Sequence, residues 1–245
     1  MRPTMVLFGD SITQRGWSVG GWGARLADTY GRRADVLNRG YSGYNSAKAL
    51  HLLPAVFPGA AEAPALVTVF LGANDASSQP AHHVPVAAYA ANLRAIAAHV
   101  RDAYGERTAL VFITPPPVGE AARVRANHER WGTPLEAPPE RSNAVTGKYA
   151  AACREVAEEL GCALVDIFSG FQEAPAWQET HLNDGLHFAP AGDQALHAAL
   201  MEVIAGRLAH LAPGEMPYDF PEWSDVDAAD ATTFKRNVCV AFQPQ

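Results

Sequence analysis

The sequence predicts a doubly wound α/β fold, a three-layer αβα sandwich around a flavodoxin-like parallel sheet of five strands. Short β-rich runs alternate along the chain with longer segments in which Ala and Leu recur at helical spacing. Four of the five runs are continuous or nearly continuous apolar blocks, which is typical of strands that helices cover on both faces. The spacing fits an open doubly wound sheet better than a barrel of eight βα units.

The expected strands and helices take turns along the chain. We expect strands at residues 5–8, 34–37, 65–71, 108–113 and 163–167, where apolar residues run together. We expect helices at residues 22–30, 46–53, 86–103, 143–160 and 190–211, where apolar residues recur at helical spacing. This alternation is the signature of a doubly wound domain, which we assign to residues 1–211.

Two segments depart from this alternation. Residues 115–141 are rich in Pro, Gly, Glu and Arg and are long for a connection, so we expect a loop over one edge of the sheet. Residues 212–245 form a C-terminal extension that contains Pro213, Pro217 and Pro221, followed by an acidic patch. A loosely packed terminus is one interpretation of this extension, and packing on the domain or on a second copy in a homo-oligomer is the other.

Composition bounds the classes of function. The chain has 245 residues, 48% of them apolar, a net charge of −7 and a pI near 5.7. A chain of this length can bury a core without disulfides or metals. The acidic balance argues against a nucleic-acid-binding protein or one that binds an anionic membrane, so we expect neither partner.

The cysteines and the apolar runs indicate a cytoplasmic protein. Cys153, Cys162 and Cys239 form no Cys-x-x-Cys pair, which disfavours a zinc ribbon and a secreted disulfide framework. The apolar run at residues 4–9 is too short for the core of a signal peptide, and no stretch reaches the ~18 apolar residues of a membrane span.

A serine follows the first expected strand in Gly9-Asp10-Ser11-Ile12-Thr13. Ser11 would lie at the carboxyl end of a sheet strand, where α/β folds bind their ligands, so it is a candidate nucleophile. The alternative is that Asp10 and Ser11 only cap a helix, since both residue types are favoured at an N-cap.

A candidate base lies near the end of the domain in Asp184-Gly185-Leu186-His187. A serine hydroxyl is a poor nucleophile until a base removes its proton, and a carboxylate must hold that base in one tautomer. Asp184 and His187 are three residues apart in a turn and could supply these two groups. A surface turn with a helix-capping Asp is the alternative.

Two further loops offer hydrogen-bond donors. Asn74 closes the most apolar strand in Gly72-Ala73-Asn74-Asp75, where its side-chain amide could donate to an oxyanion. Gly43 follows the second strand, where a backbone N–H could approach a reacting carbonyl. Plain turns explain either loop singly, but together the four loops gather at one sheet edge the groups that acyl transfer requires.

Competing chemistries lack their motifs. The serine elbow of an α/β-hydrolase needs Gly-x-Ser-x-Gly, and the nearest sequence, Gly40-Tyr41-Ser42-Gly43-Tyr44, fails at its last two positions. His82 and His83 have no carboxylate or cysteine partner at ligand spacing, so we interpret them as solvated loop histidines. We expect no metal and no cofactor.

The four motifs, in this order and spacing, resemble the SGNH, or GDSL, hydrolase superfamily. The resemblance spans Gly9 to His187, and its one small departure is Ile12 where the family usually has Leu. It implies the SGNH hydrolase fold and an ester hydrolase. Matched motif to motif, it implies Ser11 as nucleophile, His187 as base with Asp184 as its partner, and an oxyanion hole of Ser11, Gly43 and Asn74.

Within that superfamily the chain resembles the isoamyl-acetate-hydrolysing esterases. The resemblance rests on residues 7–13, 70–76 and 184–188, and on Met216-Pro217-Tyr218 with Trp223 in the extension. It implies small, uncharged esters such as short-chain acetates, cleaved through an acyl-enzyme. An apolar pocket suits such a substrate, and we expect its walls to be Trp22, Pro115, Trp177 and Phe188.

Three other functions stay open. A carbohydrate O-acetyl esterase or an acyl thioesterase would use the same triad. A thioesterase acting on coenzyme A esters should show a basic cluster for the phosphates, and no run of Lys and Arg is present. A catalytically silent binding module is the alternative outside enzymes.

Overall fold

A five-stranded parallel sheet forms the centre of the protein. The computed structural model describes residues 2–59 and 62–237, so Cys239 lies outside the described residues. The strands are β1 (Thr4–Gly9), β2 (Asp35–Gly40), β3 (Leu66–Phe70), β4 (Ala109–Ile113) and β5 (Ala163–Val165). They are hydrogen-bonded in the order β2-β1-β3-β4-β5, and every pair is parallel. The predicted flavodoxin-like order is confirmed.

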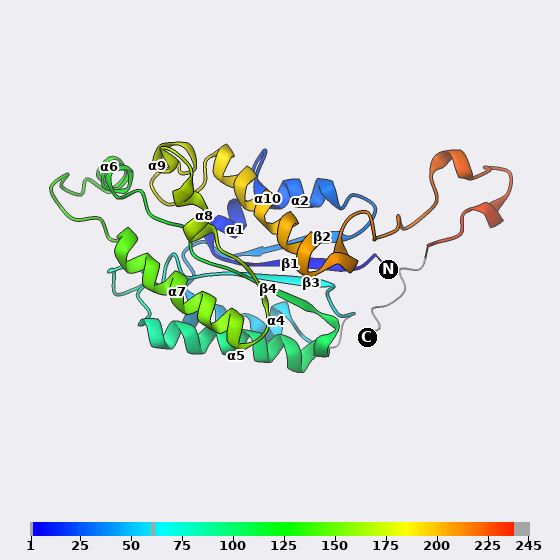
Figure 1. The fold of residues 1–245 in the computed structure, drawn as a ribbon, viewed down its shortest axis with the longest axis horizontal. Coiled ribbons are helices and arrows are strands. Elements are labelled where there is room, and N and C mark those ends of the chain that lie inside the picture. Colours follow the sequence, from blue (N-terminus) through cyan, green and yellow to red (C-terminus); the bar gives the residue numbers. More distant parts are fainter. Residues whose placement is uncertain (1, 60–61, 238–245) are drawn as a thin grey trace.

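Helices cover both faces of the sheet (Figure 1). On one face lie α1 (Ser11–Arg15), α2 (Trp22–Thr29), α8 (Ile167–Glu173) and α10 (Pro190–Arg207). On the other lie α3 (Ser46–Leu50), α4 (Leu53–Val56), α5 (Val86–Tyr104) and α7 (Asn143–Glu159). The predicted three-layer sandwich is therefore confirmed.

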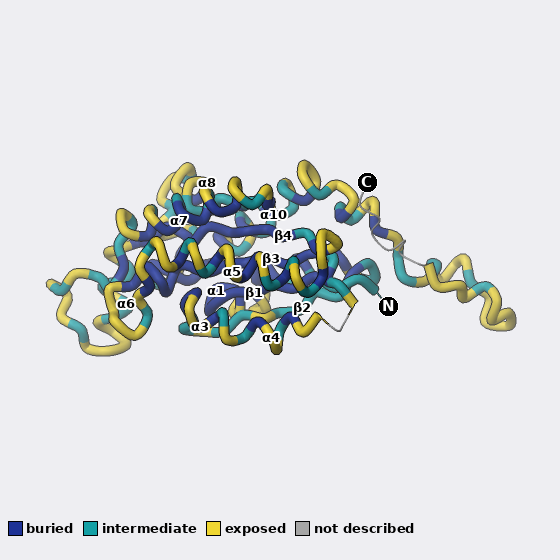
Figure 2. Tube along the Cα trace, turned by 90° about the horizontal axis from the view of Figure 1, so that it is seen from below, coloured by how far each residue is buried: buried dark blue, intermediate teal, exposed yellow. Residues whose placement is uncertain are grey.

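Alternation along each strand divides the core into two halves. Met5 and Leu7 of β1 point into the core beneath α2 and α10, whereas Val6 and Phe8 point into the core against α3 and α5. All four side chains are buried, which explains why the strand reads as one continuous apolar block. In Figure 2 the central strands β1, β3 and β4 are mostly buried, whereas the edge strand β2 is only half-buried.

The expectation of a loop at residues 115–141 was wrong, because this segment contains a helix, α6 (Glu120–Trp131). No residue of α6 is buried, and the helix lies at the end of the molecule beside the carboxyl ends of the strands (Figures 1 and 2). Val124 and Trp131 are the only large apolar residues of α6, so this helix has too few apolar positions to give the pattern that revealed the other long helices.

Several element boundaries also differ from the expected ones. The last strand ends at Val165 rather than at residue 167, because Asp166 caps α8 by accepting a hydrogen bond from the backbone N of Ser169 (3.2 Å). Residues 46–53 fall in two short helices, α3 and α4, and not in one. A further short helix, α9 (Trp177–Thr180), precedes the Asp184 turn.

The first part of the extension packs on the loop after α2. Met216 is buried, and the ring of Tyr218 lies 4.4 Å from the guanidinium carbon of Arg32 and 4.3 Å from that of Arg33. Beyond it the chain leaves the sandwich (Figure 1), and Trp223 is 85% exposed. Among the described residues, no helix combines the length and the hydropathy that a membrane span requires.

Candidate active site

Ser11 begins α1, two residues after the end of β1. Asp10 caps this helix, since its Oδ1 accepts a hydrogen bond from the backbone N of Ile12 (2.9 Å). A Cβ on Gly9 would lie 2.2 Å from Oγ1 of Thr13 and 2.5 Å from the carbonyl oxygen of Phe70, so the helix can turn this closely against β3 only after a glycine. Asp10 is thus the N-cap of α1, and Ser11 is the first residue of the helix. The capping interpretation of Asp10 is therefore compatible with Ser11 as the candidate nucleophile.

The structure joins Ser11, His187 and Asp184 in one hydrogen-bonded chain. Ser11 Oγ lies 2.9 Å from His187 Nε2, and His187 Nδ1 lies 2.8 Å from Asp184 Oδ2. Asp184 Oδ1 also accepts hydrogen bonds from the backbone N atoms of Leu186 (3.1 Å) and His187 (2.8 Å). The three side chains lie 176 and three positions apart in sequence and meet at the carboxyl edge of the sheet.

The electrostatics of Asp184 keep this carboxylate ionised. Burial raises its pKa, but the hydrogen bonds and charge of His187, together with the charge of Arg123, outweigh burial and hold the pKa well below its usual range. An ionised Asp184 accepts the Nδ1–H of His187, and Nε2 is then the nitrogen with a free lone pair toward Ser11.

Asn74 and Gly43 lie on the same cavity as Ser11. Asn74 Nδ2 donates to the carbonyl oxygen of Tyr44 (2.9 Å) and makes a longer contact with Asp10 Oδ2 (3.5 Å). Gly43 has a φ of +79°, a conformation that favours glycine, and its loop brings it to the cavity wall. The structure thus brings together all five residues that the motifs singled out.

Arg141 fixes the orientation of Asn74, and the sequence analysis missed it. Its Nη2 donates to Asn74 Oδ1 (2.9 Å) and its Nε donates to the carbonyl oxygen of Ala73 (2.6 Å). Because a guanidinium can only donate, the atom of Asn74 that faces it must be the oxygen, and the amide N–H groups must point the other way. Burial lowers the pKa of Arg141, which is 5% exposed, yet the group remains charged.

A chain of ion pairs runs from Arg141 to Asp184. Arg141 pairs with Glu140, Glu140 accepts from Arg123 (2.7 Å), and Arg123 Nη1 lies 3.2 Å from Asp184 Oδ2. Burial raises the pKa of Glu140, but its bonds to Arg123, Asn127 and Arg141 bring it below the ordinary value. Arg123 lies in α6, and Glu140 and Arg141 lie in the segment between α6 and α7. The segment expected to be a loop therefore connects Asn74 to Asp184 across the site.

Two buried carboxyl groups lie behind this network. Burial raises the pKa of Asp10 to about 7, with a further contribution from Asp75, while the hydrogen bond from Ile12 and the charge of Arg141 lower it. Burial likewise raises the pKa of Asp75 to about 6, against the hydrogen bonds that Asp75 accepts from Ser46. The site therefore rests on carboxyl groups that titrate near neutral pH.

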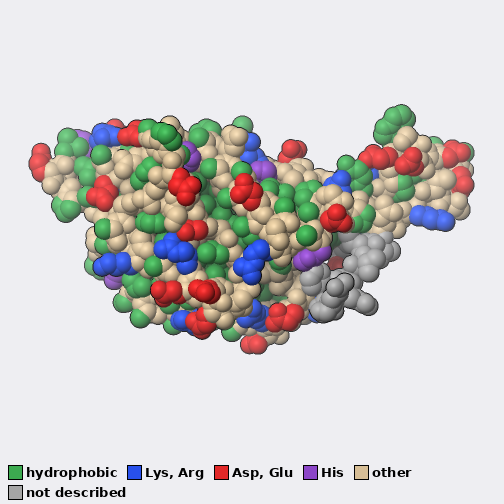
Figure 3. Space-filling view, in the orientation of Figure 1, with side chains coloured by type: hydrophobic (Ala, Val, Ile, Leu, Met, Phe, Trp, Pro, Cys, Tyr) green, Lys and Arg blue, Asp and Glu red, His purple; other side chains and the backbone are tan. Residues whose placement is uncertain are grey.

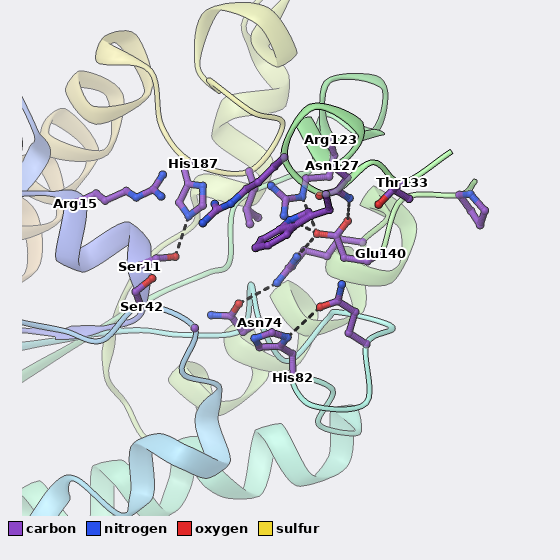
Figure 4. Close-up of a pocket in the computed structure, with 17 residues that line it drawn as sticks. Ser11, Arg15, Ser42, Asn74, His82, Arg123, Asn127, Thr133, Glu140 and His187 are labelled. Carbon is purple, nitrogen blue, oxygen red and sulfur yellow. Dashed lines mark hydrogen bonds and ion pairs between the residues drawn. The ribbon is translucent and has the colours of Figure 1, made fainter. Parts of the chain in front are cut away.

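The site opens into a cavity of about 430 Å³, which we call the Ser11 cavity (Figure 4). Seventeen residues line it, and thirteen of them carry a polar or charged side chain. The apolar side chains among them are Trp131, Pro138 and Leu186. The expectation of a mostly apolar pocket was therefore wrong.

The four residues expected to form its walls lie elsewhere. Trp22 is fully buried under α10 and donates its indole N–H to the carbonyl oxygen of Ile12 (3.3 Å). Phe188 packs against the Phe70 and Phe171 rings, Trp177 packs on the same core, and Pro115 is buried beside Gly72. A large apolar side chain is stabilised in a core as well as in an apolar pocket. The residue type alone therefore does not show which of the two places it occupies.

One histidine also differs from its interpretation as a solvated loop residue. His82 lines the Ser11 cavity, and its Nδ1 lies 3.2 Å from Gln79 Oε1 (Figure 4). Its loop follows β3, and Asn45 holds the loop by donating to the carbonyl oxygen of His82 (2.7 Å). This contact joins residues 37 positions apart, and no local pattern indicates it.

Known proteins resemble the chain over most of its length. Residues 7–195 match the model of the GDSL-like lipase/acylhydrolase family. A GDSL esterase/lipase of Arabidopsis thaliana is 42% identical over 245 residues, which cover 98% of this chain and 100% of that protein. The mouse isoamyl acetate-hydrolyzing esterase 1 homolog is 39% identical over 233 residues, which cover 93% of this chain and 89% of that protein.

A solved structure agrees with these relatives. The crystal structure of a lipase/acylhydrolase from Enterococcus faecalis superimposes with a TM-score of 0.64 at 25% identity. The superposition covers 84% of this chain and 97% of the bacterial one. The resemblance inferred from the four motifs is therefore confirmed.

Replacing Asp10 by Asn is expected to flatten the pH dependence of stability. The pKa of Asp10 is about 7 in the folded protein and ordinarily 3.8, so between these values the folded chain keeps a proton that the unfolded chain has lost. The contribution of Asp10 to the free energy of unfolding should therefore fall as the pH rises from about 4 to about 7 and level off above. Urea unfolding across this range should show a smaller fall for Asp10→Asn.

The pKa of Asp75 is also raised by burial, so Asp75 lowers the free energy of unfolding with rising pH in the same way as Asp10. Part of this pH dependence should therefore remain in Asp10→Asn. Asp102→Asn, on the exposed face of α5, is the matched control and should keep the native slope. An unchanged slope in Asp10→Asn would contradict the assignment of the raised pKa to Asp10.

Proposed function

The chain belongs to the GDSL-like lipase/acylhydrolase family, and we propose that within it this protein is a serine esterase that cleaves small carboxylic esters through an acyl-enzyme. Membership makes the protein a hydrolase. The observation that carries the proposal is the chain of two hydrogen bonds from Ser11 Oγ through His187 to Asp184. A serine, a base and an orienting carboxylate in this order are the parts of a nucleophilic hydrolase.

In the first half of the reaction, His187 Nε2 takes the proton of Ser11 as Oγ attacks the ester carbonyl. The C–O bond to the alcohol then breaks, and the alcohol leaves with the proton that His187 returns. The acyl group is now bound to Ser11 Oγ. In the second half, His187 takes a proton from water, the hydroxide attacks the acyl carbon, and Ser11 regains its proton as the acid leaves.

Three donors are available for the oxyanion: the backbone N–H groups of Ser11 and Gly43 and the side-chain amide of Asn74. Asn74 Nδ2 keeps one hydrogen bond to Tyr44, whereas its 3.5 Å contact with Asp10 is weak enough to be exchanged for an oxyanion. Arg141 holds the amide so that its nitrogen and not its oxygen is the available atom. Donors fixed before the reaction stabilise the developing charge without reorganisation.

The cavity favours a short acyl group. Its volume of about 430 Å³ suits a small ester, and its three apolar side chains do not form the long apolar channel that a fatty acyl chain requires. The mouse relative is named for the hydrolysis of isoamyl acetate, a short-chain acetate. The polar lining also favours a second candidate function, an esterase for acetyl groups on polyhydroxylated alcohols such as carbohydrates, because such alcohols need many hydrogen-bond partners.

We also place this activity in a reducing, cytoplasmic compartment. Cys153 and Cys162 are both buried and free, and burial raises the pKa of both thiols, which favours the inert thiol form.

The Ser11→Ala variant tests the nucleophile. Hydrolysis of p-nitrophenyl acetate should fall at least about a thousandfold, because the substitution removes the hydroxyl that attacks the ester and carries the acyl group. A fluorophosphonate probe should label the native chain and leave Ser11→Ala unmodified. Ser169→Ala, which removes an exposed serine of α8, is the control and should keep both activity and labelling. Undiminished activity in Ser11→Ala would refute the mechanism, and an unlabelled native chain would indicate a silent binding module.

A second variant tests Arg141 as a positioning residue for Asn74. Arg141→Lys keeps a cation beside Glu140 but cannot bond both Asn74 Oδ1 and the Ala73 carbonyl in the same way. We expect kcat to fall roughly 10- to 100-fold with KM nearly unchanged, because Asn74 donates to a charge that exists only in the transition state.

The control for this variant is a double-mutant cycle. In the Asn74→Ala background, Arg141→Lys should cost little more, since the group that Arg141 orients is already absent. Losses that multiply in the double variant would show that Arg141 acts by another route.

The acyl preference is tested with p-nitrophenyl esters of increasing chain length. We expect kcat/KM for the acetate to exceed that for the octanoate by at least about tenfold, because the cavity has few apolar walls for a long chain. The shared leaving group keeps chemical reactivity nearly constant along the series. Equal or faster turnover of the octanoate would overturn the small-acyl proposal.

A further inference from the structure

The Ser11 cavity gathers arginines that are far apart in sequence. Arg15, Arg123, Arg130 and Arg141 all line it, and Glu140 is the one carboxylate among the lining residues. No run of Lys and Arg is present, so the sequence did not signal this cluster. Two of the arginines are occupied, since Arg123 and Arg141 pair with Glu140, and Arg123 also pairs with Asp184.

The other two arginines are uncommitted. Within residues 2–59 and 62–237, neither Arg15 nor Arg130 forms an ion pair, and the guanidinium of Arg130 lies 4.8 Å from the ring of Trp131. Arg15 comes four residues after Ser11 in α1, which puts both side chains on one face of the helix. Figure 4 shows Arg15 extended toward His187, so its cationic end lies on the reaction side of the cavity.

Fewer carboxylates than arginines lie in or beside the cavity. Counting Asp184 with Glu140 gives two carboxylates against the four arginines. Asp10 and Asp75 lie behind the wall and are buried, with pKa values raised to about 7 and about 6 by that burial. On the face drawn in Figure 3, acidic side chains are scattered among basic ones over the sandwich, and others lie on the extension. At physiological salt, charges more than ~8 Å away are largely screened, so the net −7 of the chain has little effect inside the cavity.

We propose that the Ser11 cavity selects esters that carry a negative charge, a carboxylate or a phosphate, close to the scissile bond, through Arg15 and Arg130. This inference rests on the proposed esterase function and names its preferred substrate class. A guanidinium donates two parallel hydrogen bonds to a carboxylate or phosphate, and such charge-assisted bonds are stronger than neutral ones. Uncharged esters remain substrates, but they leave both cations without an anionic partner.

The test compares two acetate esters of one shape, 3-acetoxybenzoate and 3-acetoxybenzamide. They share the acetyl group and the ring, and they differ in a carboxylate against a neutral amide. We expect kcat/KM for the benzoate to exceed that for the benzamide by at least about tenfold at low salt, and the ratio should shrink as salt is added. 2-Acetoxyethyl phosphate against 2-acetoxyethanol separates a phosphate preference from a carboxylate preference by the same ratio.

The variant Arg15→Gln/Arg130→Gln should bring the ratio for the benzoate pair close to one. Arg125→Gln is the matched control, since it removes an exposed arginine from the same helix as Arg130 without touching the cavity. A ratio at or below one in the native chain for both ester pairs, or a ratio that survives in the double variant, would overturn the inference. Hydrolysis of the benzamide without an anionic preference would refute this inference and leave the esterase function standing. Failure to hydrolyse any ester, together with no fluorophosphonate labelling, would refute both.

Discussion

The parallel pairing of β1 between β2 and β3 is the constraint from which the site follows. Gly9, the last residue of β1, is paired with Gly40, the last residue of β2, and with Phe70, the last residue of β3. Three strands therefore end at one level, and Ser11, Gly43 and Asn74 come two, three and four residues later. Because a parallel sheet directs all its carboxyl ends to one edge, these residues converge although their loops are unrelated in sequence. Only His187 and Asp184 must arrive from elsewhere, in the turn before α10.

The same constraint explains which parts of the site were predictable. A strand end is visible as the end of an apolar run, and the residues just after it are few, so Ser11, Gly43 and Asn74 could be selected from the sequence. Arg141 and His82 could not, because each reaches the site through tertiary contacts, with Ala73 and Asn74 in one case and with Asn45 in the other. Helix α6 was missed for a different reason, since it contains few large apolar residues and none of its residues is buried.

The net charge of the chain does not predict the charge inside the Ser11 cavity. The chain is acidic overall, and this argued against polyanionic partners, but the Ser11 cavity is lined by four arginines and one glutamate. Net charge sums over a surface on which distant groups are screened, whereas a ligand in a cavity feels the groups within several ångströms of it. Arg15, Arg123, Arg130 and Arg141 come from two regions of the chain that meet only after folding, so a count of residues cannot show that they lie together.

Residues 115–141 link the two halves of the site and also form its wall. Through Arg141 they orient Asn74, through Arg123 they contact Asp184, and through Arg130 and Trp131 they line the cavity. No residue of α6 is buried, so little core packing fixes its place, and the ion pairs around Glu140 must contribute much of its docking. A substitution in α6 that loosens these pairs would therefore change substrate selection and the geometry of both Asn74 and Asp184 together. Specificity and catalytic alignment are coupled here because one lightly buried segment supports both.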